Sequence, residues 1–213
     1  MRPPTTPSPS PTTPERVPGP SLVGLTGGIA AGKSETLRIL GELGAATIST
    51  DAIVHDLLGR LDVRDSLVAR WGAEVAPADA IDRSRVAALV FERPEELAWL
   101  ESLLHPLVGE RVAEWVRDLP ADVAVAVVEV PLLFEGTMAA TFDATIAVVT
   151  DDVERERRAA ERGTGELEGR SGRQLSQDEK AARATHVIHN DGTTAELEAE
   201  VRRLMPELAA AGR

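Results

Sequence analysis

The chain has 213 residues, enough for one domain with a full hydrophobic core. It has no cysteine, which excludes disulfides, thiolate metal sites and cysteine nucleophiles. Its net charge of −12 disfavours nonspecific binding to nucleic acid or to an anionic membrane surface. No apolar stretch approaches the ~20 residues of a membrane span, and the first residues lack the apolar core of a signal peptide. We therefore expect a cytoplasmic protein with neither a nucleic acid nor a membrane as its partner.

Residues 1–20 are expected to form a disordered tail ahead of the domain. They hold eight of the fourteen prolines, with Ser and Thr between them. Such a segment buries too little apolar surface to offset the entropy of ordering it. A proline-rich docking peptide is the alternative, but no P-x-x-P with basic flanks stands out. The folded domain is then expected over residues 21–213.

The first elements of the domain surround a phosphate-binding motif. Residues 22–26 form a short apolar run that predicts a strand, and 35–43 carry apolar residues at helical spacing. Between them, residues 27–34 read Gly-Gly-Ile-Ala-Ala-Gly-Lys-Ser and match G-x-x-x-x-G-K-[ST] in full. A strand, a glycine loop and a helix N-terminus together aim N–H groups at an anion. We expect Lys33 to reach the β- and γ-phosphates and Ser34 to bind Mg²⁺.

A candidate catalytic carboxylate follows the second predicted strand. Residues 45–49 read as that strand, and Asp51 opens a helix that runs through Leu58. Ligands of open α/β sheets bind at the carboxyl ends of the strands. From there Asp51 could accept the proton of an attacking hydroxyl or hold Mg²⁺. A helix N-cap is the alternative use of an aspartate at this position, and both uses can hold together.

The middle of the chain is predicted to be a helical insertion into a parallel sheet. Residues 62–118 are mostly helical in pattern, and His105-Pro106 predicts the end of one helix and the start of another. Further strands are expected over 123–130, 144–149 and 186–189, with helices at 152–162, 176–184 and 194–210 between and after them. Near-continuous apolar strands alternating with helices indicate a doubly wound, five-stranded parallel α/β sheet.

An acidic chain that binds phosphates has to concentrate its cations locally. Arg155, Arg158 and Arg162 share one predicted helical face, and Arg170 follows within a glycine-rich stretch. Guanidinium groups there could close over a transferring phosphoryl group and neutralise its charge. A solvated helix with glutamate partners is the alternative. We prefer that alternative for Arg155 and Arg157, and a phosphate role for Arg158, Arg162 and Arg170.

Several further stretches resemble one family of phosphate-loop kinases. The more specific of them are L-L-H-P at 103–106 and V-P-L-L-F-E at 130–135. The others are L-T-G-G-I at 25–29, Asp51, the Arg170…Gln174 pair, and V-I-H-N-D-G at 187–192. They follow one another in family order over about residues 22–205. On these motifs, the chain resembles the dephospho-coenzyme A kinases.

The resemblance implies an activity and a set of site residues. It implies a kinase that uses ATP and Mg²⁺ to phosphorylate the 3′-hydroxyl of dephospho-coenzyme A, the last step of coenzyme A synthesis. The implied catalytic residues are Asp51, Lys33, Arg158, Arg162 and Arg170, with Ser34 and Asp51 at the metal. The implied nucleotide-binding residues are Gly27, Gly28, Ile29, Ala30, Ala31, Gly32, Lys33, Ser34, Glu35 and Asn190. The implied acceptor-binding residues are His105, Pro131, Leu132, Leu133 and Glu135.

The resemblance also implies how the domain is divided. The core is expected over about 21–58, 119–153 and 174–213, a helical acceptor-binding insert over about 59–118, and a lid over about 154–173. Some positions depart from the usual family pattern: Ala30 where glycine is common, Glu35 where a hydroxyl residue is usual, Ser49 in place of a first aspartate, and His55 in place of an arginine. Metal binding is therefore expected to rest mainly on Asp51.

Two other functions remain open from the sequence. One is a phosphate-loop kinase that acts on a different small molecule. The other is a nucleotide-binding switch, which should carry Asp-x-x-Gly at a strand end and an Asn-Lys-x-Asp base reader. Here the one Asp-x-x-Gly falls within a predicted helix, and Asn190 is followed by Asp191. We expect a small-molecule acceptor and a monomer or weak homo-oligomer.

Overall fold

The protein contains one parallel five-stranded sheet. The computed structural model describes residues 19–152, 154, 155, 157 and 174–212. The strand order is β2-β3-β1-β4-β5, and every neighbouring pair is parallel. The strands are β1 (Ser21–Gly27), β2 (Ala46–Ser49), β3 (Val125–Glu129), β4 (Ala144–Val149) and β5 (His186–His189). The predicted five-stranded parallel sheet is confirmed, and its carboxyl ends all meet at one edge.

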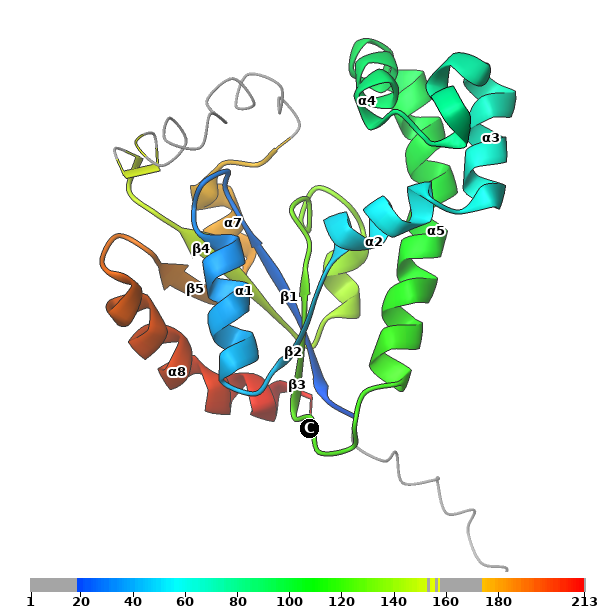
Figure 1. The fold of residues 1–213 in the computed structure, drawn as a ribbon. Coiled ribbons are helices and arrows are strands. Elements are labelled where there is room, and N and C mark those ends of the chain that lie inside the picture. Colours follow the sequence, from blue (N-terminus) through cyan, green and yellow to red (C-terminus); the bar gives the residue numbers. More distant parts are fainter. Residues whose placement is uncertain (1–18, 153, 156, 158–173, 213) are drawn as a thin grey trace, which may run out of the picture.

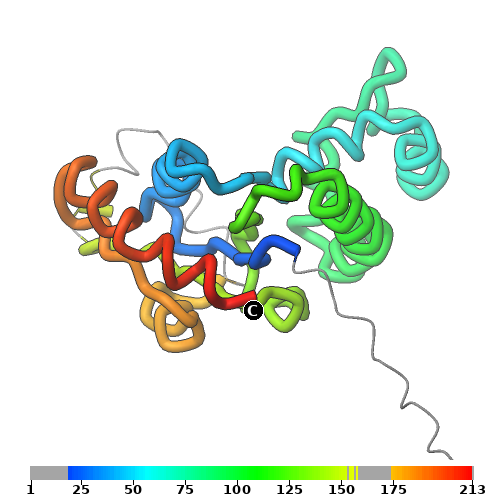
Figure 2. Tube along the Cα trace, turned by 90° about the horizontal axis from the view of Figure 1, so that it is seen from below, coloured from blue at the N-terminus to red at the C-terminus, as the bar shows by residue number. Residues whose placement is uncertain are grey.

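Helices cover both faces of this sheet, as Figures 1 and 2 show. Side chains of α1 (Lys33–Glu42) and α8 (Thr194–Ala211) pack with one set of strand residues, such as Val23 and Leu25. Successive strand residues point to opposite faces, so Leu22 belongs to the second cluster of the core. The short helix α7 (Gln177–Arg183) lies on the side of that second set, where its Lys180 reaches Pro131. The fold is therefore doubly wound.

The long connection between β2 and β3 forms a helical block beyond the β2 side of the sheet (Figure 1). Its elements are α2 (Thr50–Leu58), α3 (Leu61–Trp71), the 3₁₀ turns η1 (Ala73–Val75) and η2 (Pro77–Asp79), α4 (Arg83–Glu92) and α5 (Pro94–Arg117). A third 3₁₀ turn, η3 (Met138–Thr141), follows β3. Trp71 and Trp99 meet edge to face at 5.1 Å, and Trp71 Nε1 donates to Glu96 at 2.8 Å. These contacts join α3 to α5.

The predicted helix break at His105-Pro106 is wrong. The helix α5 runs without interruption from Pro94 to Arg117 and includes Pro106. A proline inside a helix removes one backbone hydrogen bond and normally bends or ends the helix. Here Leu104 lies before the proline and Val108 after it, and both are buried in the same hydrophobic cluster. Because the core holds both halves of the helix, the loss of one hydrogen bond does not divide it.

Some sequence predictions fall outside the described residues. Residues 1–18, most of the predicted helix at 152–162, and most of the expected lid at 154–173 are among them. The division into core, insert and lid stays a prediction. Within the described part of the chain, no helix combines the length and the apolar character that crossing a membrane requires.

Candidate active site at the carboxyl edge of the sheet

The phosphate motif forms a loop between β1 and α1. Residue Gly32 caps α1 with a left-handed φ of 101°, and Lys33 is the first residue of the helix. The first N–H groups of a helix have no intrahelical acceptor, and the helix dipole adds positive potential there. Ser34 lies in this first turn with its side chain exposed. The strand, loop and helix predicted from the motif are therefore present, and the loop presents anion-binding groups at the sheet edge.

Lys33 folds back over the loop that carries it. Its Nζ donates to the carbonyl oxygens of Gly27 at 3.1 Å and Gly28 at 2.9 Å. Burial is the largest influence on the pKa of Lys33 and lowers it; the charge of Lys180 lowers it further, whereas the charges of Glu129 and Asp51 raise it. These two carboxylates therefore lie within electrostatic range of the ammonium group. A bound phosphate would replace the carbonyl oxygens as its acceptor.

The far end of the sheet supports the loop through Asn190. This residue directly follows β5, and its side chain is 7% exposed. Its Nδ2 donates to the Ala31 carbonyl oxygen at 2.9 Å and packs against Gly32. This nitrogen is thus engaged by the loop itself. The predicted contact between Asn190 and a nucleotide stays a prediction. Ala30 adopts a left-handed φ of 60°, which an alanine holds at a cost that a glycine there would not have.

Asp51 lies in the first turn of α2, within electrostatic range of Lys33 in the loop. Ser49 is the N-cap of α2 and Asp51 is its second residue, so Asp51 is not the cap. The neighbouring Thr50 donates through Oγ1 to the Glu129 carbonyl oxygen at 3.0 Å and so ties the start of α2 to the end of β3. The Asp51 side chain is exposed. An exposed carboxylate within electrostatic range of Lys33 can receive a proton from an incoming hydroxyl.

The segment that follows β3, residues 131–135, contains the predicted acceptor residues in different environments. Leu132 is 39% exposed, whereas Leu133 is fully buried in the core. The Pro131 carbonyl oxygen accepts from Thr26 Oγ1 at 3.1 Å. Glu135 is largely buried and pairs with Lys180 at 3.1 Å. Of these side chains, Leu132 is the one that solvent reaches most freely, and contact of the others with an acceptor stays a prediction.

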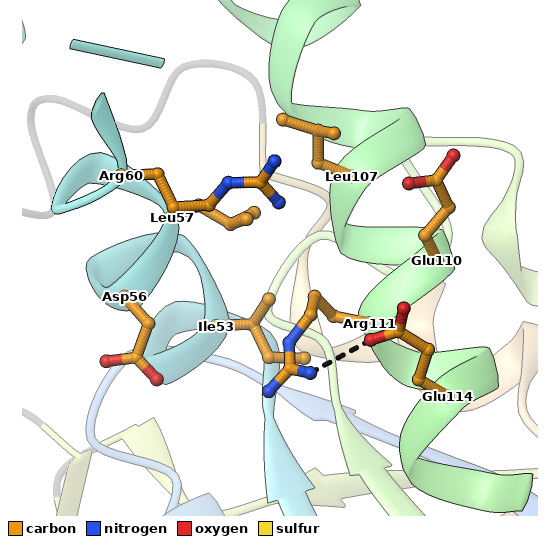
Figure 3. A pocket seen from close by; sticks show the side chains of 8 residues that line it. All are labelled: Ile53, Asp56, Leu57, Arg60, Leu107, Glu110, Arg111 and Glu114. Carbon is orange, nitrogen blue, oxygen red and sulfur yellow. Dashed lines mark hydrogen bonds and ion pairs between the residues drawn. The ribbon is translucent and has the colours of Figure 1, made fainter. Parts of the chain in front are cut away.

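A groove of about 360 Å³ lies between α2 and α5 (Figure 3). The side chains of Ile53, Asp56 and Leu57 line it from α2, and that of Arg60 lines it from the turn before α3. Those of Leu107, Glu110, Arg111 and Glu114 line it from α5. At 100° per residue, Asp51 lies on the opposite face of α2. By the same count, His105, which is exposed, lies on the opposite face of α5. The groove is therefore separate from the predicted reaction centre.

The face of α2 that carries Asp51 also carries His55, one turn further along. Arg83 Nη1 of α4 lies 2.7 Å from His55 Nδ1, within hydrogen-bond distance, and a guanidinium can act only as the donor. Among the described residues, Arg83 forms no ion pair with a carboxylate within 4.0 Å. Sequence reasoning missed Arg83, because no local pattern links residues 28 positions apart. The contact with His55 holds its guanidinium group one helical turn along α2 from Asp51.

A second cavity, of about 480 Å³, lies beside the phosphate loop. Gly28 and Ile29 line it from the loop, Asp152 and Arg155 line it from the segment after β4, and residues 174–178 complete the wall. Arg155 pairs with Asp152 at 3.2 Å. Arg157 pairs with Glu154, as the solvated-helix interpretation predicted. Arg158, Arg162 and Arg170 lie outside the described residues, so their predicted phosphate role stays a prediction.

Glu35 and the candidate metal ligands complete the description of the phosphate loop. Glu35 lies in the first turn of α1, but its carboxylate accepts from Arg38 at 2.7 Å, and this hydrogen bond lowers the pKa of Glu35. The Glu35 carboxylate is therefore engaged by Arg38. No cluster of three or more acidic or histidine side chains that could hold a metal occurs in the described ranges. A metal here would depend on phosphate oxygens together with the Ser34 hydroxyl and the Asp51 carboxylate, which are oxygen ligands of the kind Mg²⁺ prefers.

These features define a class of protein. A parallel sheet with a complete phosphate loop after β1, a carboxylate after β2 and a helical insertion is the architecture of a phosphate-loop kinase. The same fold occurs in a solved structure of dephospho-CoA kinase from Campylobacter jejuni, which superimposes with a TM-score of 0.59 over 88% of this chain and 97% of that one, at 24% identity.

The sequence comparisons show the family. The family model described as dephospho-CoA kinase matches residues 21–196, and the chain belongs to this family. A relative named dephospho-CoA kinase from Protochlamydia amoebophila (strain UWE25) is 38% identical over 193 residues, which is 87% of this chain and 95% of the relative. The crystal structure of TT1252 from Thermus thermophilus has a TM-score of 0.78 and 32% identity, over 89% of this chain and 98% of that one.

The geometry of Gly32 generates a prediction about nucleotide binding. A Cβ added at Gly32 would overlap the Asn190 amide, and the backbone has a φ of 101° that alanine disfavours. We expect Gly32→Ala to weaken ATP binding by roughly five- to thirtyfold, since holding a left-handed residue other than glycine in the binding conformation costs on the order of 1–2 kcal/mol. Isothermal titration calorimetry measures this change. Gly41→Ala within α1 is the control, because its added Cβ comes no closer than 3.7 Å to other atoms. An unchanged Kd in Gly32→Ala would contradict the assigned loop geometry.

Proposed function

We propose that this chain transfers the γ-phosphoryl group of ATP to the 3′-hydroxyl of dephospho-coenzyme A, giving coenzyme A and ADP. The observation that carries the proposal is the opposition of Lys33 in a complete phosphate loop and Asp51 at the start of α2, in a chain that matches the family model over residues 21–196. The donor ATP, the ion Mg²⁺, a monomer or weak homo-oligomer and a cytoplasmic location are parts of the same proposal.

The donor phosphates lie on the loop in this proposal. The backbone of residues 27–34 and the N-terminus of α1 hold the β- and γ-phosphates, and Lys33 exchanges its carbonyl acceptors for phosphate oxygens. The rest of the nucleotide extends into the cavity beside Gly28 and Ile29. Mg²⁺ would be held by Ser34, Asp51 and the phosphates, and when bound it would supply positive charge that offsets the negative charge of the transferring group.

The reaction is an in-line exchange of one P–O bond for another. The 3′-oxygen of the acceptor attacks the γ-phosphorus, its O–H proton passes to the Asp51 carboxylate, and the bond from the γ-phosphorus to the β–γ bridging oxygen breaks. ADP leaves with the electron pair of that bond. Arg158, Arg162 and Arg170 are proposed to neutralise the charge on the transferring group. Positioning and charge stabilisation carry most of such a reaction.

The acceptor is proposed to lie along the Asp51 face of α2 and the segment after β3. Pro131, Leu132, Leu133 and Glu135 belong to that segment, and His105 of α5 extends the surface. Dephospho-coenzyme A carries a diphosphate, which requires a cation near its ribose. Arg83, held by His55 one turn from Asp51, supplies a guanidinium without a described carboxylate partner. We propose that Arg83 binds the acceptor's anionic part.

The first test is turnover itself. Wild-type protein with Mg²⁺ and ATP is expected to produce ADP when dephospho-coenzyme A is added, and Lys33→Ala is expected to abolish that production, because it removes a charge placed for the transition state. A coupled ADP assay and a melting curve measure activity and folding together. Near-normal turnover of folded Lys33→Ala would contradict the mechanism. Much faster phosphorylation of adenosine or a nucleoside monophosphate would instead favour a kinase for another small molecule.

A second variant tests the proton acceptor. Asp51→Asn keeps the shape of the side chain and removes its negative charge. We expect kcat to fall by at least ~10²-fold, the lower range for general-base catalysis, while the Kd for ATP changes much less. Steady-state kinetics and calorimetry separate the two effects. Asp56→Asn, on the opposite face of α2, is the matched control and should leave kcat unchanged. Normal turnover of Asp51→Asn would mean that the carboxylate has no chemical role.

A third variant tests the acceptor contact of Arg83. Arg83→Ala is expected to raise the KM for dephospho-coenzyme A by roughly tenfold, because a charge-assisted hydrogen bond contributes about 1.5–3 kcal/mol. The KM for ATP should stay near the wild-type value. Arg85→Ala on the same helix is the control, since Arg85 pairs with Asp82 and bonds to the Glu74 carbonyl oxygen. Equal effects of the two substitutions on the KM for dephospho-coenzyme A would contradict the proposed contact between Arg83 and the acceptor.

A further inference from the structure

Lys180 is a fully buried cation on α7. It is 0% exposed, and by volume it is the largest of the fully buried residues in the described part of the chain. Its Nζ donates to the Pro131 carbonyl oxygen at 2.7 Å and pairs with Glu135 Oε1 at 3.1 Å. Burying an ammonium ion costs free energy that one ion pair seldom recovers in full, and apolar replacements of buried pairs are often at least as stable. Stability therefore does not account for the charge.

The composition of the chain points to the same conclusion. The chain has 21 arginines but only two lysines, and the two are Lys33 and Lys180. Lys33 is the cation of the phosphate loop. An ammonium is a compact point charge with three rotatable donors, whereas a guanidinium is planar and larger. A protein that otherwise uses arginine has a lysine at these two largely enclosed positions, where a compact donor is needed.

The Pro131 carbonyl oxygen connects Lys180 to the phosphate loop. This oxygen accepts from Lys180 Nζ and also from Thr26 Oγ1, at 3.1 Å. Thr26 is fully buried in β1 and directly precedes Gly27, where the phosphate motif begins. The first residue of the acceptor-side segment is therefore held from two directions, by α7 and by the strand that leads into the loop.

Glu135 anchors the other end of the segment of residues 131–135. Its Oε1 accepts from the Leu175 backbone N–H at 2.9 Å and forms the ion pair with Lys180 at 3.1 Å. Its Oε2 is buried without a hydrogen-bond partner in the described part of the chain. Within the described part of the chain, Lys180 is thus the cation that pairs with this carboxylate. Through Pro131 and Glu135, one ammonium group holds both ends of residues 131–135.

The helix that carries Lys180 also touches the phosphate loop directly. Gln177 donates to the Thr150 carbonyl oxygen at 3.0 Å and accepts from the Thr150 N–H at 3.1 Å, which fixes the start of α7 to the end of β4. A Cβ added at Gly28 would come within 3.0 Å of Gln177, so this side chain lies against the loop. A capping box between Ser176 and Glu179 completes the start of α7.

We propose that Lys180 is a positioning residue for phosphoryl transfer. It holds residues 131–135, on the acceptor side, at a set distance from the phosphate loop that binds the donor. Lys180 acts through Pro131 and Glu135 and does not itself contact substrate. The proposal rests on the proposed function, because it assigns the acceptor to that segment. The repulsion between Lys180 and Lys33 indicates that the two cations lie within electrostatic range of each other.

The test separates an effect of Lys180 on the position of the acceptor from an effect on the stability of the protein. Lys180→Met removes the charge and keeps the length of the side chain. We expect kcat/KM for dephospho-coenzyme A to fall by on the order of 10²-fold, as a displacement near 1 Å can produce. The Kd for ATP, measured without acceptor, should change much less. Arg202→Met removes a cation from the exposed side of α8 and is the control, with wild-type kinetics expected.

A double variant decides between positioning and simple structural support. Lys180→Met alone leaves the Glu135 charge buried and unpaired, which lowers stability. Lys180→Met with Glu135→Gln removes both charges, so the melting temperature should recover while kcat/KM stays low. Recovery of both quantities would overturn the proposal. Because the double variant avoids the unpaired charge, it carries the test even if the single variant does not fold.

The absence of cysteine allows a direct rescue of the ammonium. Lys180→Cys introduces the one thiol of the chain, and aminoethylation of the unfolded protein followed by refolding gives a side chain of nearly lysine length and charge. Turnover should return after aminoethylation and stay low without it. Wild type taken through the same unfolding and refolding is the control. A refolded, aminoethylated protein with a normal melting temperature and no recovered turnover would overturn the proposal.

The outcomes also distinguish this inference from the proposed function. Failure of wild type to phosphorylate dephospho-coenzyme A would contradict the function, whatever Lys180 does. Active wild type with equally active, folded Lys180→Met would contradict the positioning role alone. A parallel loss of ATP affinity and of kcat/KM would also contradict it, because the effect would then lie on the donor side.

Discussion

The site depends on holding positive charge in an enclosed place within a protein of net charge −12. Desolvation opposes a buried ammonium, and burial indeed lowers the pKa of Lys33 more than any neighbouring charge changes it. The charges of Glu129 and Asp51 act in the opposite direction and favour the protonated form. The same two carboxylates would repel a phosphate, so the loop N–H groups and the end of α1 are needed to restore an attractive potential there.

The parallel sheet determines which groups share this potential. Strands that run in one direction end at one edge, so residues far apart in sequence arrive together. Thr26 of β1 donates to the Pro131 carbonyl oxygen just after β3, and the start of α2 bonds to the end of β3. Thr150, just after β4, donates through Oγ1 to the carbonyl oxygen of Asn190, just after β5, at 2.9 Å. Each of these contacts links two neighbouring strand ends. The phosphate loop therefore sits on a sheet edge where hydrogen bonds join neighbouring strand ends, which restricts its movement relative to the acceptor side.

Sequence reasoning succeeded where the relevant contacts are local. The strand, loop and helix around Lys33 follow from one contiguous motif and from apolar periodicity, and the sheet follows from nearly uninterrupted apolar strands. It failed at Pro106, because the local effect of a proline on the helix is outweighed by Leu104 and Val108, which are buried in one cluster. It also did not identify Arg83, whose relation to His55 requires α4 to lie beside α2.

The sequence by itself determined the phosphate-binding motif, the succession of the five strands, and the family, because these depend on residues that are adjacent or regularly spaced. Only the tertiary structure decided which way side chains face: that Asp51 lies on the face of α2 opposite the α2–α5 groove, that Glu135 is buried against Lys180, and that Asn190 bonds to the loop. The physical reason is that burial and pairing of a charge depend on neighbours contributed by other elements. Spacing along one element does not contain that information.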